Sequence, residues 1–496
     1  MASRRKNRCQ SRPTVFEVAG LYARLIGCAV TLCVPAWIVV STAATAQDRL
    51  ACVQGVSWTD PPLAAPPVDV CGTSSNTDAT SFYTLSWELF KFLVWPASNE
   101  RGKPDTTKKI TDAGPRTFET LKADWETFLP DARRPADWNV YPSVAEPCSN
   151  HTAIGPGALV LASFNKFGIL SEVFRPGLDN FLVAQNRTYV RYLAGYSETV
   201  FSKIQNEGLY DADVVRLIPG TERGKPVPDR GRVDDGALTV KSAWIELPTE
   251  GPNHIDPSRF YVRDDALIQE LDSGECRIAT VGLVGLHVVY KTPSRPQWIW
   301  STFEHVDNVP EADQEPGRQF TFNDGDPTDH QTTDPEPDFQ IPRPDGFNGP
   351  GVPPRAFQVE RLQQIQRRVL IANEAQQGAL GSLGSVWQNY KLVMTQWPGF
   401  PFAPNRGADA FPQPPCSARN GLATVNTTME TFHQTQSHCF LERTCMGCHE
   451  VARKTDFVFS ITLHPHHRPG PPTLPAVPDS RALAIRQLQD FLQLGK

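Results

Sequence analysis

The residue pattern that most limits what this chain can form is the pentapeptide Cys445-Met446-Gly447-Cys448-His449 near its C-terminal end. Two thiols three residues apart lie about one helical turn from each other, so both can add to the vinyl groups on one edge of a porphyrin. The imidazole that follows directly can then bind the iron. The pattern predicts one covalently attached haem, with Cys445 and Cys448 as tethers and His449 as the proximal iron ligand.

Two other uses of these cysteines stay open. A redox-active C-x-x-C pair normally opens a helix after a strand of a βαβ unit. Here Thr427 and Glu430 form a capping box, which predicts a helix leading into the motif instead. A zinc site built from the two cysteines with His464 and His467 nearly matches a known ligand spacing, with the last interval one residue short. Haem attachment is favoured over both.

The first 46 residues have the pattern of an export signal. A basic stretch from Arg4 to Arg8 precedes an apolar run from Leu25 to Val40, and small residues follow as far as Ala46. The last three, Ala44-Thr45-Ala46, are the A-x-A pattern that signal peptidase cuts. We expect a mature protein that starts at Gln47, lies in the periplasm or is secreted, and has no stable membrane insertion. An uncleaved membrane anchor is the alternative.

Charge excludes one class of partner. The export signal holds six basic residues and one acidic residue, which leaves 42 basic and 53 acidic residues and a net charge of −11 for the rest. Nucleic-acid binding depends on clustered positive charge, so no nucleic-acid partner is expected. An acidic surface suits a basic redox partner protein, although solubility alone also explains the charge.

Six cysteines remain when the export signal and the haem motif are set aside: Cys52, Cys71, Cys148, Cys276, Cys416 and Cys439. An even number in an oxidising compartment predicts disulfides. The pairs Cys52–Cys71 and Cys416–Cys439 are favoured only by their short loops, and the sequence leaves the pairing open.

Residues 416–496 resemble a compact cytochrome c domain. In that family a helix leads into C-x-x-C-H, a loop crosses the haem face and a C-terminal helix packs back. The counterparts here are the helix expected from Thr427, a proline-rich loop from Leu463 to Pro478, and an amphipathic segment from Asp479. The resemblance implies a small all-α domain. It departs from the family in the distal ligand, because no methionine follows Met446.

The distal side of the iron therefore needs another ligand. The loop after the motif supplies His464, His466 and His467, and one of the three is expected to complete a bis-histidine pair. Met394 and Met429, which precede the motif, are the methionines that the usual pairing would have to recruit. Solvent-exposed loop histidines are the alternative reading.

Residues 47–415 carry no recognised catalytic signature and are expected to form a large α+β domain. Hydrophobic periodicity predicts helices at Thr80–Val94 and Ala356–Gln377 and strands at Gly157–Phe164, 238–244, Arg277–Tyr290 and Gln297–Val306. The last two strands should pair as a hairpin, and Gly282 and Gly285 indicate close backbone approach. Fragments such as Trp300-Ser301-Thr302-Phe303-Glu304 resemble those of large exported bacterial proteins that end in C-x-x-C-H.

Several other features allow a functional reading but favour a structural one. His287 is expected to be a core histidine with its hydrogen bonds satisfied. Glu304 with His305 could line a site or be an ordinary polar pair at a strand end, and the sequence leaves both open. The acidic, proline-rich segment 307–354 offers oxygens to calcium, yet it lacks EF-hand spacing and is expected to be a solvated loop. The aromatic residues Trp387, Tyr390 and Trp397 predict core or haem-facing packing.

Taken together, these features predict an exported monohaem c-type cytochrome with an electron-transfer role. A haem enzyme of the peroxidase or oxygenase type, with an open iron position, is the first alternative. A binding or sensing protein with a structural haem is the second.

Overall fold

The computed structural model describes residues 52–72, 78–151, 154–164, 182–220, 227–250, 254–270, 273–312, 317–326, 356–399, 418–419, 425–431, 434 and 445–469. The chain divides into two compact units, Met1–Thr45 and Ala46–Lys496, and every described residue belongs to the second. The expected export signal, the predicted C-terminal helix from Asp479 and most of the acidic segment 307–354 lie outside the described residues.

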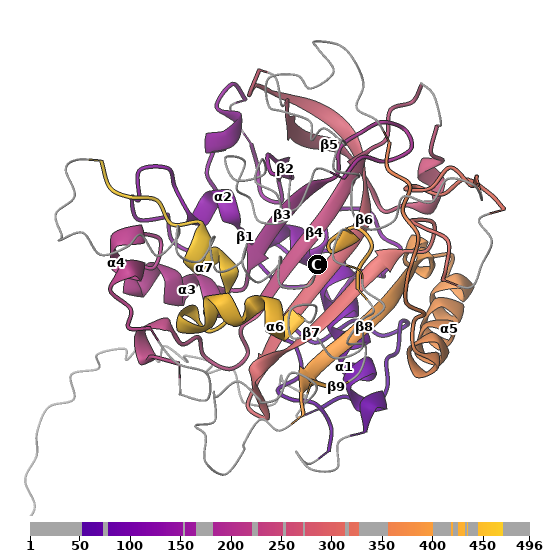
Figure 1. Ribbon diagram of the computed structural model, residues 1–496, viewed down its shortest axis with the longest axis horizontal. Helices are drawn as coiled ribbons and strands as arrows, with labels where there is room; N and C mark the ends of the chain where they lie inside the picture. The colour runs from indigo at the N-terminus through magenta and orange to yellow at the C-terminus, as the bar shows by residue number, and fades with distance from the viewer. Residues whose placement is uncertain are drawn as a thin grey trace, which may run out of the picture. The chain divides into compact units, whose positions relative to one another are not determined.

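One nine-stranded sheet forms the centre of the second unit (Figure 1). Its main path runs β1-β3-β4-β6-β7-β8-β9 in antiparallel pairs, and β5 branches from β6 and holds β2 in parallel. The sheet curls into a half-barrel, which its register shifts at Ala243/Trp244 and Thr302/Phe303 favour because bulges increase strand twist. The strands are β1 (Lys122–Ala123), β2 (Val160–Leu161), β3 (Arg191–Tyr196), β4 (Leu238–Glu246), β5 (Val262–Gln269), β6 (Cys276–Thr292), β7 (Arg295–His305), β8 (Tyr390–Pro398) and β9 (Ala418–Arg419).

The long hairpin of β6 and β7 confirms the corresponding sequence prediction. The chain turns between Thr292 and Arg295, which are partners in the ladder. A Cβ atom added at Gly285 would lie 2.2 Å from the Thr428 hydroxyl oxygen, and one added at Gly282 would lie 2.8 Å from a Leu247 methyl carbon. Both glycines therefore allow the close approach that the sequence indicated. The predicted strand at Gly157–Phe164 is shorter than expected: β2 is its only regular strand, and Ser163 forms an isolated bridge with Tyr192.

Helix α1 (Ala79–Val94) lies where the sequence predicted it and covers one face of the sheet. The Ser86 hydroxyl is 2.8 Å from that of Ser301 and 2.7 Å from that of Thr395, two residues that face each other on β7 and β8. Side chains alternate along a strand, so the neighbours Thr302 and Met394 point to the opposite face. The remaining described helices are α2 (Asp124–Thr127), α3 (Glu198–Glu207), α4 (Ala212–Arg216), α5 (Arg367–Ser382), α6 (Cys445–His449) and α7 (Phe459–Leu463), with 3₁₀ turns η1 (Thr117–Thr120), η2 (Glu146–Cys148), η4 (Asp229–Gly231), η5 (Pro257–Arg259), η6 (Val386–Asn389) and η10 (Glu450–Thr455).

The helix predicted at Ala356–Gln377 is wrong in its first half, since α5 begins at Arg367. Before α5 the main chain is bonded to distant segments. The Phe357 amide donates to the Val183 carbonyl (3.1 Å) and the Val359 amide to the Phe322 carbonyl (2.7 Å). These long-range bonds override a local pattern that would otherwise favour a helix.

The predicted fold class, an α+β region followed by a separate small all-α cytochrome c-like domain, is also wrong. In the described part of residues 416–496, β9 pairs with β8, and α6 contacts β7 and β8 (Figure 1). The short segments η10 and α7 follow, and η10 contacts both α6 and α7. The stretch at Thr427 is a turn and not a helix. Its amide and hydroxyl donate to Glu304 Oε2, at 3.0 and 2.9 Å, instead of capping a helix. One curled mixed sheet therefore dominates the fold.

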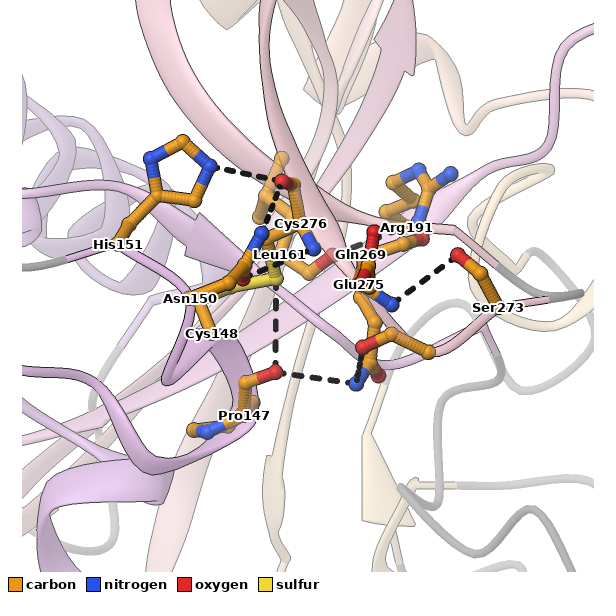
Figure 2. Close-up of a disulfide and its surroundings, with 11 residues drawn as sticks. Pro147, Cys148, Asn150, His151, Leu161, Arg191, Gln269, Ser273, Glu275 and Cys276 are labelled. Carbon is orange, nitrogen blue, oxygen red and sulfur yellow. Dashed lines mark hydrogen bonds between the residues drawn. A yellow bond between two sulfur atoms is a disulfide. The ribbon is translucent and has the colours of Figure 1, made fainter.

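Two disulfides are present among the described cysteines. Cys52–Cys71 is the pair that its short loop favoured, while Cys416 and Cys439 lie outside the described residues. The second, Cys148–Cys276, joins residues 128 positions apart and fastens η2 to the start of β6 (Figure 2). Asn150 and His151 reinforce the junction, since both side chains donate to the Cys276 carbonyl, at 2.9 and 2.7 Å.

Candidate functional site

The three residues of the predicted haem motif lie together on α6, a single helical turn that begins at Cys445 and ends at His449. Cys445, Cys448 and His449 are half-buried and line the same cavity. The two cysteines are not bonded to each other. Both thiols and the imidazole are thus presented to one space, as covalent haem attachment requires.

Specific contacts fix α6 against the sheet. Met446 is buried, and its amide donates to the side-chain oxygen of Gln396 on β8 over 3.1 Å. The His449 ring packs between two aromatic rings, with centroid distances of 4.4 Å to Trp300 and 4.3 Å to Phe459. Met446 is therefore the residue that anchors the helix turn, while the neighbouring thiols face the cavity.

The orientation of His449 is set by a main-chain acceptor. Its Nδ1 atom lies 2.7 Å from the Phe457 carbonyl oxygen. A carbonyl only accepts, so Nδ1 carries the proton and Nε2 is the nitrogen with a lone pair for a metal. Metal-binding histidines are usually held in this way, with the second nitrogen donating to a carbonyl or carboxylate.

The turn that presents the Phe457 carbonyl is anchored by its neighbour Asp456. This residue is fully buried and has a left-handed backbone (φ 54°), a conformation that Asp tolerates better than most residues. Its carboxylate accepts from the Val233 amide (2.9 Å) and pairs with Lys291 of β6, while its carbonyl accepts from Trp298 Nε1 (2.9 Å). Three distant segments thus hold the turn behind His449.

The cavity has an empty volume of ≈ 1320 Å³, counting its open mouth, between the sheet and the C-terminal segment. One row of facing residues crosses its floor from β3 to β8: Ala194, Lys241, His287, Thr302 and Met394. A second row lies two residues further along the strands: Tyr196, Thr239, Val289 and Trp300. Phe457, Val458, Phe459 and Leu463 close the other side, so most of the lining is apolar and suits a porphyrin.

His287 has its hydrogen bonds satisfied, as the sequence predicted, but it lies at the cavity wall rather than in the core. Its Nδ1 atom is 2.7 Å from the Thr302 hydroxyl, and its Nε2 atom is 2.9 Å from Glu430. Lys241 is its neighbour in the β4–β6 ladder. The cavity floor therefore carries Lys241 and His287 side by side, with Glu430 bonded to the imidazole.

Of the three histidines predicted on the distal side, only His464 lines the cavity. It follows α7, and its side chain is 10% exposed. The ring Nδ1 atom lies 2.8 Å from Asp124 Oδ1, and the Phe128 ring packs edge-on against it. The Tyr196 hydroxyl donates to the same Asp124 oxygen. Burial acts to raise the pKa of the Asp124 carboxyl, but the interactions with His464 and Tyr196 outweigh it and hold that pKa below its usual value.

The other two histidines lie elsewhere. The His466 carbonyl accepts from the Ala212 amide over 3.0 Å, which fixes the loop beside α4. His467 is 52% exposed and pairs with Asp213 at 3.3 Å. The zinc reading needs His467 beside the two cysteines, and no group of three or more potential metal ligands occurs in the described part of the chain. That alternative is therefore not supported.

Among the other predicted candidates, Met394 lines this cavity and the rest do not. Met429 is buried in a separate core cluster, whereas Met394 is in the cavity floor. Glu304 is buried in ion pairs with Arg361 and Lys391, and His305 stacks on Phe260. Trp387, Tyr390 and Trp397 are buried and pack in the main core, as expected for structural aromatics.

Sequence reasoning missed four residues of the site: Asp124, Tyr196, Lys241 and Phe457. Asp124, Tyr196 and Lys241 lie far from the motif in the sequence, and no sequence pattern around them indicates a ligand site. Phe457 acts through its carbonyl, which any residue would supply. None of the helices in the described ranges has the length and hydropathy needed to cross a lipid bilayer. No protein-family model, no curated protein and no solved structure matches this chain.

Proposed function

We propose that this protein binds one haem covalently, through thioether bonds from Cys445 and Cys448, and that His449 is the proximal iron ligand. The observation that carries the proposal is the His449 hydrogen bond to the Phe457 carbonyl, at the wall of an apolar cavity that both thiols line. A histidine that is oriented through Nδ1 beside two tethering thiols has the arrangement that c-type haem needs.

The lining of the cavity fits such a group in its chemistry. Its apolar lining would shield the porphyrin faces from water. A bound haem would supply a one-electron redox centre, while Trp300, Phe459 and Phe457 keep the His449 ring in one orientation.

We assign the sixth ligand position to His464 and the function to electron transfer. His464 lines the cavity with His449, and α7 carries Phe459 against His449 at one end and leads into His464 at the other. Phe459 and His464 are five residues apart, about 7.5 Å along the helix axis at 1.5 Å per residue. Iron with two strong ligands changes little on reduction, which suits an electron relay. The acidic mature chain suits a basic redox partner in the periplasm.

A haem enzyme with an open iron position is the second candidate. The observation that favours it is the polar row of Lys241, His287 and Thr302, joined by Glu430, on the cavity floor. Ionisable groups in an apolar pocket are typical of active sites. The two candidates differ in the spin state of the iron, because a vacant sixth position gives a high-spin haem.

The covalent attachment is tested by haem staining after denaturing electrophoresis of the exported protein. The wild type should stain, and the Cys445→Ser/Cys448→Ser variant should not. Cys52→Ser/Cys71→Ser, which removes two cysteines outside the cavity, is the matched control and should stain. A wild type that carries no haem and has two reactive thiols overturns the proposal.

Visible spectra test the sixth ligand. His464→Ala should turn a low-spin spectrum high-spin, whereas His466→Ala and His467→Ala should leave it unchanged. Met394→Leu tests Met394, the other possible sixth ligand in the cavity. Loss of the low-spin spectrum in Met394→Leu, and not in His464→Ala, would assign the sixth position to Met394. A wild type that is high-spin and binds cyanide readily supports the enzyme function instead.

A further inference from the structure

Asp124 and His464 form a carboxylate–imidazole pair that joins parts of the chain 340 residues apart. Asp124 begins α2, and His464 follows α7 near the C-terminal end of the described chain. A carboxylate oxygen only accepts, so the His464 Nδ1 atom donates over the 2.8 Å that separate them. Nε2 is then the ring nitrogen with a lone pair for a metal, the same tautomer that Phe457 imposes on His449.

The carboxylate is itself held from a second side. Tyr196, at the end of β3 and 1% exposed, donates its hydroxyl hydrogen bond to the Asp124 oxygen that faces His464. The Lys241 ammonium group interacts electrostatically with the same carboxylate. On the other side of the imidazole, Phe128 limits tilting, with its ring centroid 5.8 Å from that of His464. The ring is thus restrained in both position and tautomer.

The same loop contains a second pair of identical chemistry. His467 lies 3.3 Å from Asp213, but its side chain is 52% exposed against 10% for His464, and it does not line the cavity. An acidic partner alone therefore does not distinguish His464 from His467. His464 differs because it is buried, has the shorter hydrogen bond and lies in the cavity wall.

From this arrangement we infer that Asp124 is a positioning residue for the sixth iron ligand: it orients His464 and strengthens its electron donation to the haem iron. The inference rests on the proposed haem function. A carboxylate that accepts a hydrogen bond from Nδ1 makes an imidazole a stronger electron donor at Nε2, and removal of such a partner typically weakens metal binding about 10–100-fold. The stronger donor stabilises the oxidised iron and lowers the reduction potential.

Redox titration and EPR of the exported full-length holoprotein test this inference. Asp124→Asn keeps the size of the side chain and removes its charge, so it should raise the midpoint potential and shift the low-spin EPR signal. Asp213→Asn is the matched control and should change neither. Equal potentials and EPR signals in the wild type and Asp124→Asn overturn the inference.

Chemical rescue provides a second measurement that does not depend on the His464 tether. In His464→Ala, added imidazole should bind the vacated iron position and restore the low-spin spectrum. In His464→Ala/Asp124→Asn, imidazole should bind about 10–100-fold more weakly, because its partner is gone. Equal imidazole affinity in the two variants contradicts the role of Asp124.

Failure of the proposed haem function and failure of the inference about Asp124 give different experimental results. A wild type that does not stain for haem overturns the proposed function and with it this inference. A wild type that stains for haem, but whose spectrum does not change in His464→Ala, overturns the inference together with the assignment of His464 to the sixth position, and leaves covalent attachment intact. A spectrum that changes in His464→Ala, with a potential that is unchanged in Asp124→Asn, overturns the inference alone.

Discussion

The Nδ1 atom of His449 lies 2.7 Å from the main-chain carbonyl oxygen of Phe457, eight residues further along the chain. This bond fixes both the tautomer and the direction of the imidazole. The carbonyl can hold its position only because Asp456, the residue before it, is bonded to Val233, Lys291 and Trp298. The proposed iron ligand His449 is therefore positioned by residues outside the motif, several of them in the large sheet.

Asp456→Asn should destabilise the protein by about 3–5 kcal/mol, because it leaves the buried Lys291 ammonium without its counter-charge. Urea unfolding at neutral pH measures the change. Asp229→Asn is the control: Asp229 pairs with Arg232 at the surface with its side chain 94% exposed, and its loss should have no measurable effect. Equal stability of the two variants would show that Asp456 does not anchor the turn.

Gly231→Ala should disturb the segment that follows His449. A Cβ atom at this position would lie 1.8 Å from the Lys454 carbonyl oxygen of η10, and two main-chain segments must move to relieve that clash. We expect a loss of about 1–3 kcal/mol in the free energy of unfolding. Gly220→Ala is the control, since a Cβ atom there meets no atom within 4 Å. If both variants unfold at the wild-type urea concentration, the close contact of η4 with η10 is contradicted.

His305 makes stability depend on acid pH. Its ring is fully buried, which lowers its pKa to about 4, whereas an unfolded histidine has a pKa of about 6.5. Between these values the unfolded chain binds a proton that the folded chain does not. The contribution of the neutral ring is complete above about pH 6.5 and is lost as pH falls towards about 4.

This pH dependence is checked by urea unfolding of the wild type and His305→Gln at pH 7 and pH 4.5. The wild type should lose about 2–3 kcal/mol more on acidification than the variant, which has no ionisable group there. Parallel pH profiles would mean that His305 does not titrate in this way.

N-terminal sequencing of the exported protein tests the predicted processing site. The mature chain should begin at Gln47, because Ala44-Thr45-Ala46 has the small-residue pattern that signal peptidase recognises. Ala46→Pro, which should block cleavage, is the comparison variant. Recovery of the intact N-terminal segment from the wild type would support a retained anchor instead.

The parts of the fold that sequence reasoning predicted are those fixed by neighbours along the chain. Helix α1 and the β6–β7 hairpin carry their own periodicity and turn, and the three residues of the proposed haem motif are contiguous in the sequence and lie on the single helical turn α6. The helix expected from Ala356 failed, because Phe357 and Val359 are bonded to residues that no local pattern reveals.

The same limit explains the site and the C-terminal segment. Asp124 reaches His464 across 340 residues, so only the folded chain brings them together. The resemblance of residues 416–496 to a small helical domain misled for a related reason. The Glu304 carboxylate binds Thr427, which therefore cannot cap the expected helix. The short helices that follow contact one another through η10, and α6 also contacts β7 and β8, so they form no separate domain.

The most direct test of the account is the intact mass of the exported protein under denaturing conditions. The proposed thioether bonds survive unfolding, so the mature chain from Gln47 should carry the added mass of one haem, and Cys445→Ser/Cys448→Ser should lose it. A wild type with the mass of the bare chain, or a haem that dissociates on unfolding, would contradict covalent attachment at Cys445 and Cys448.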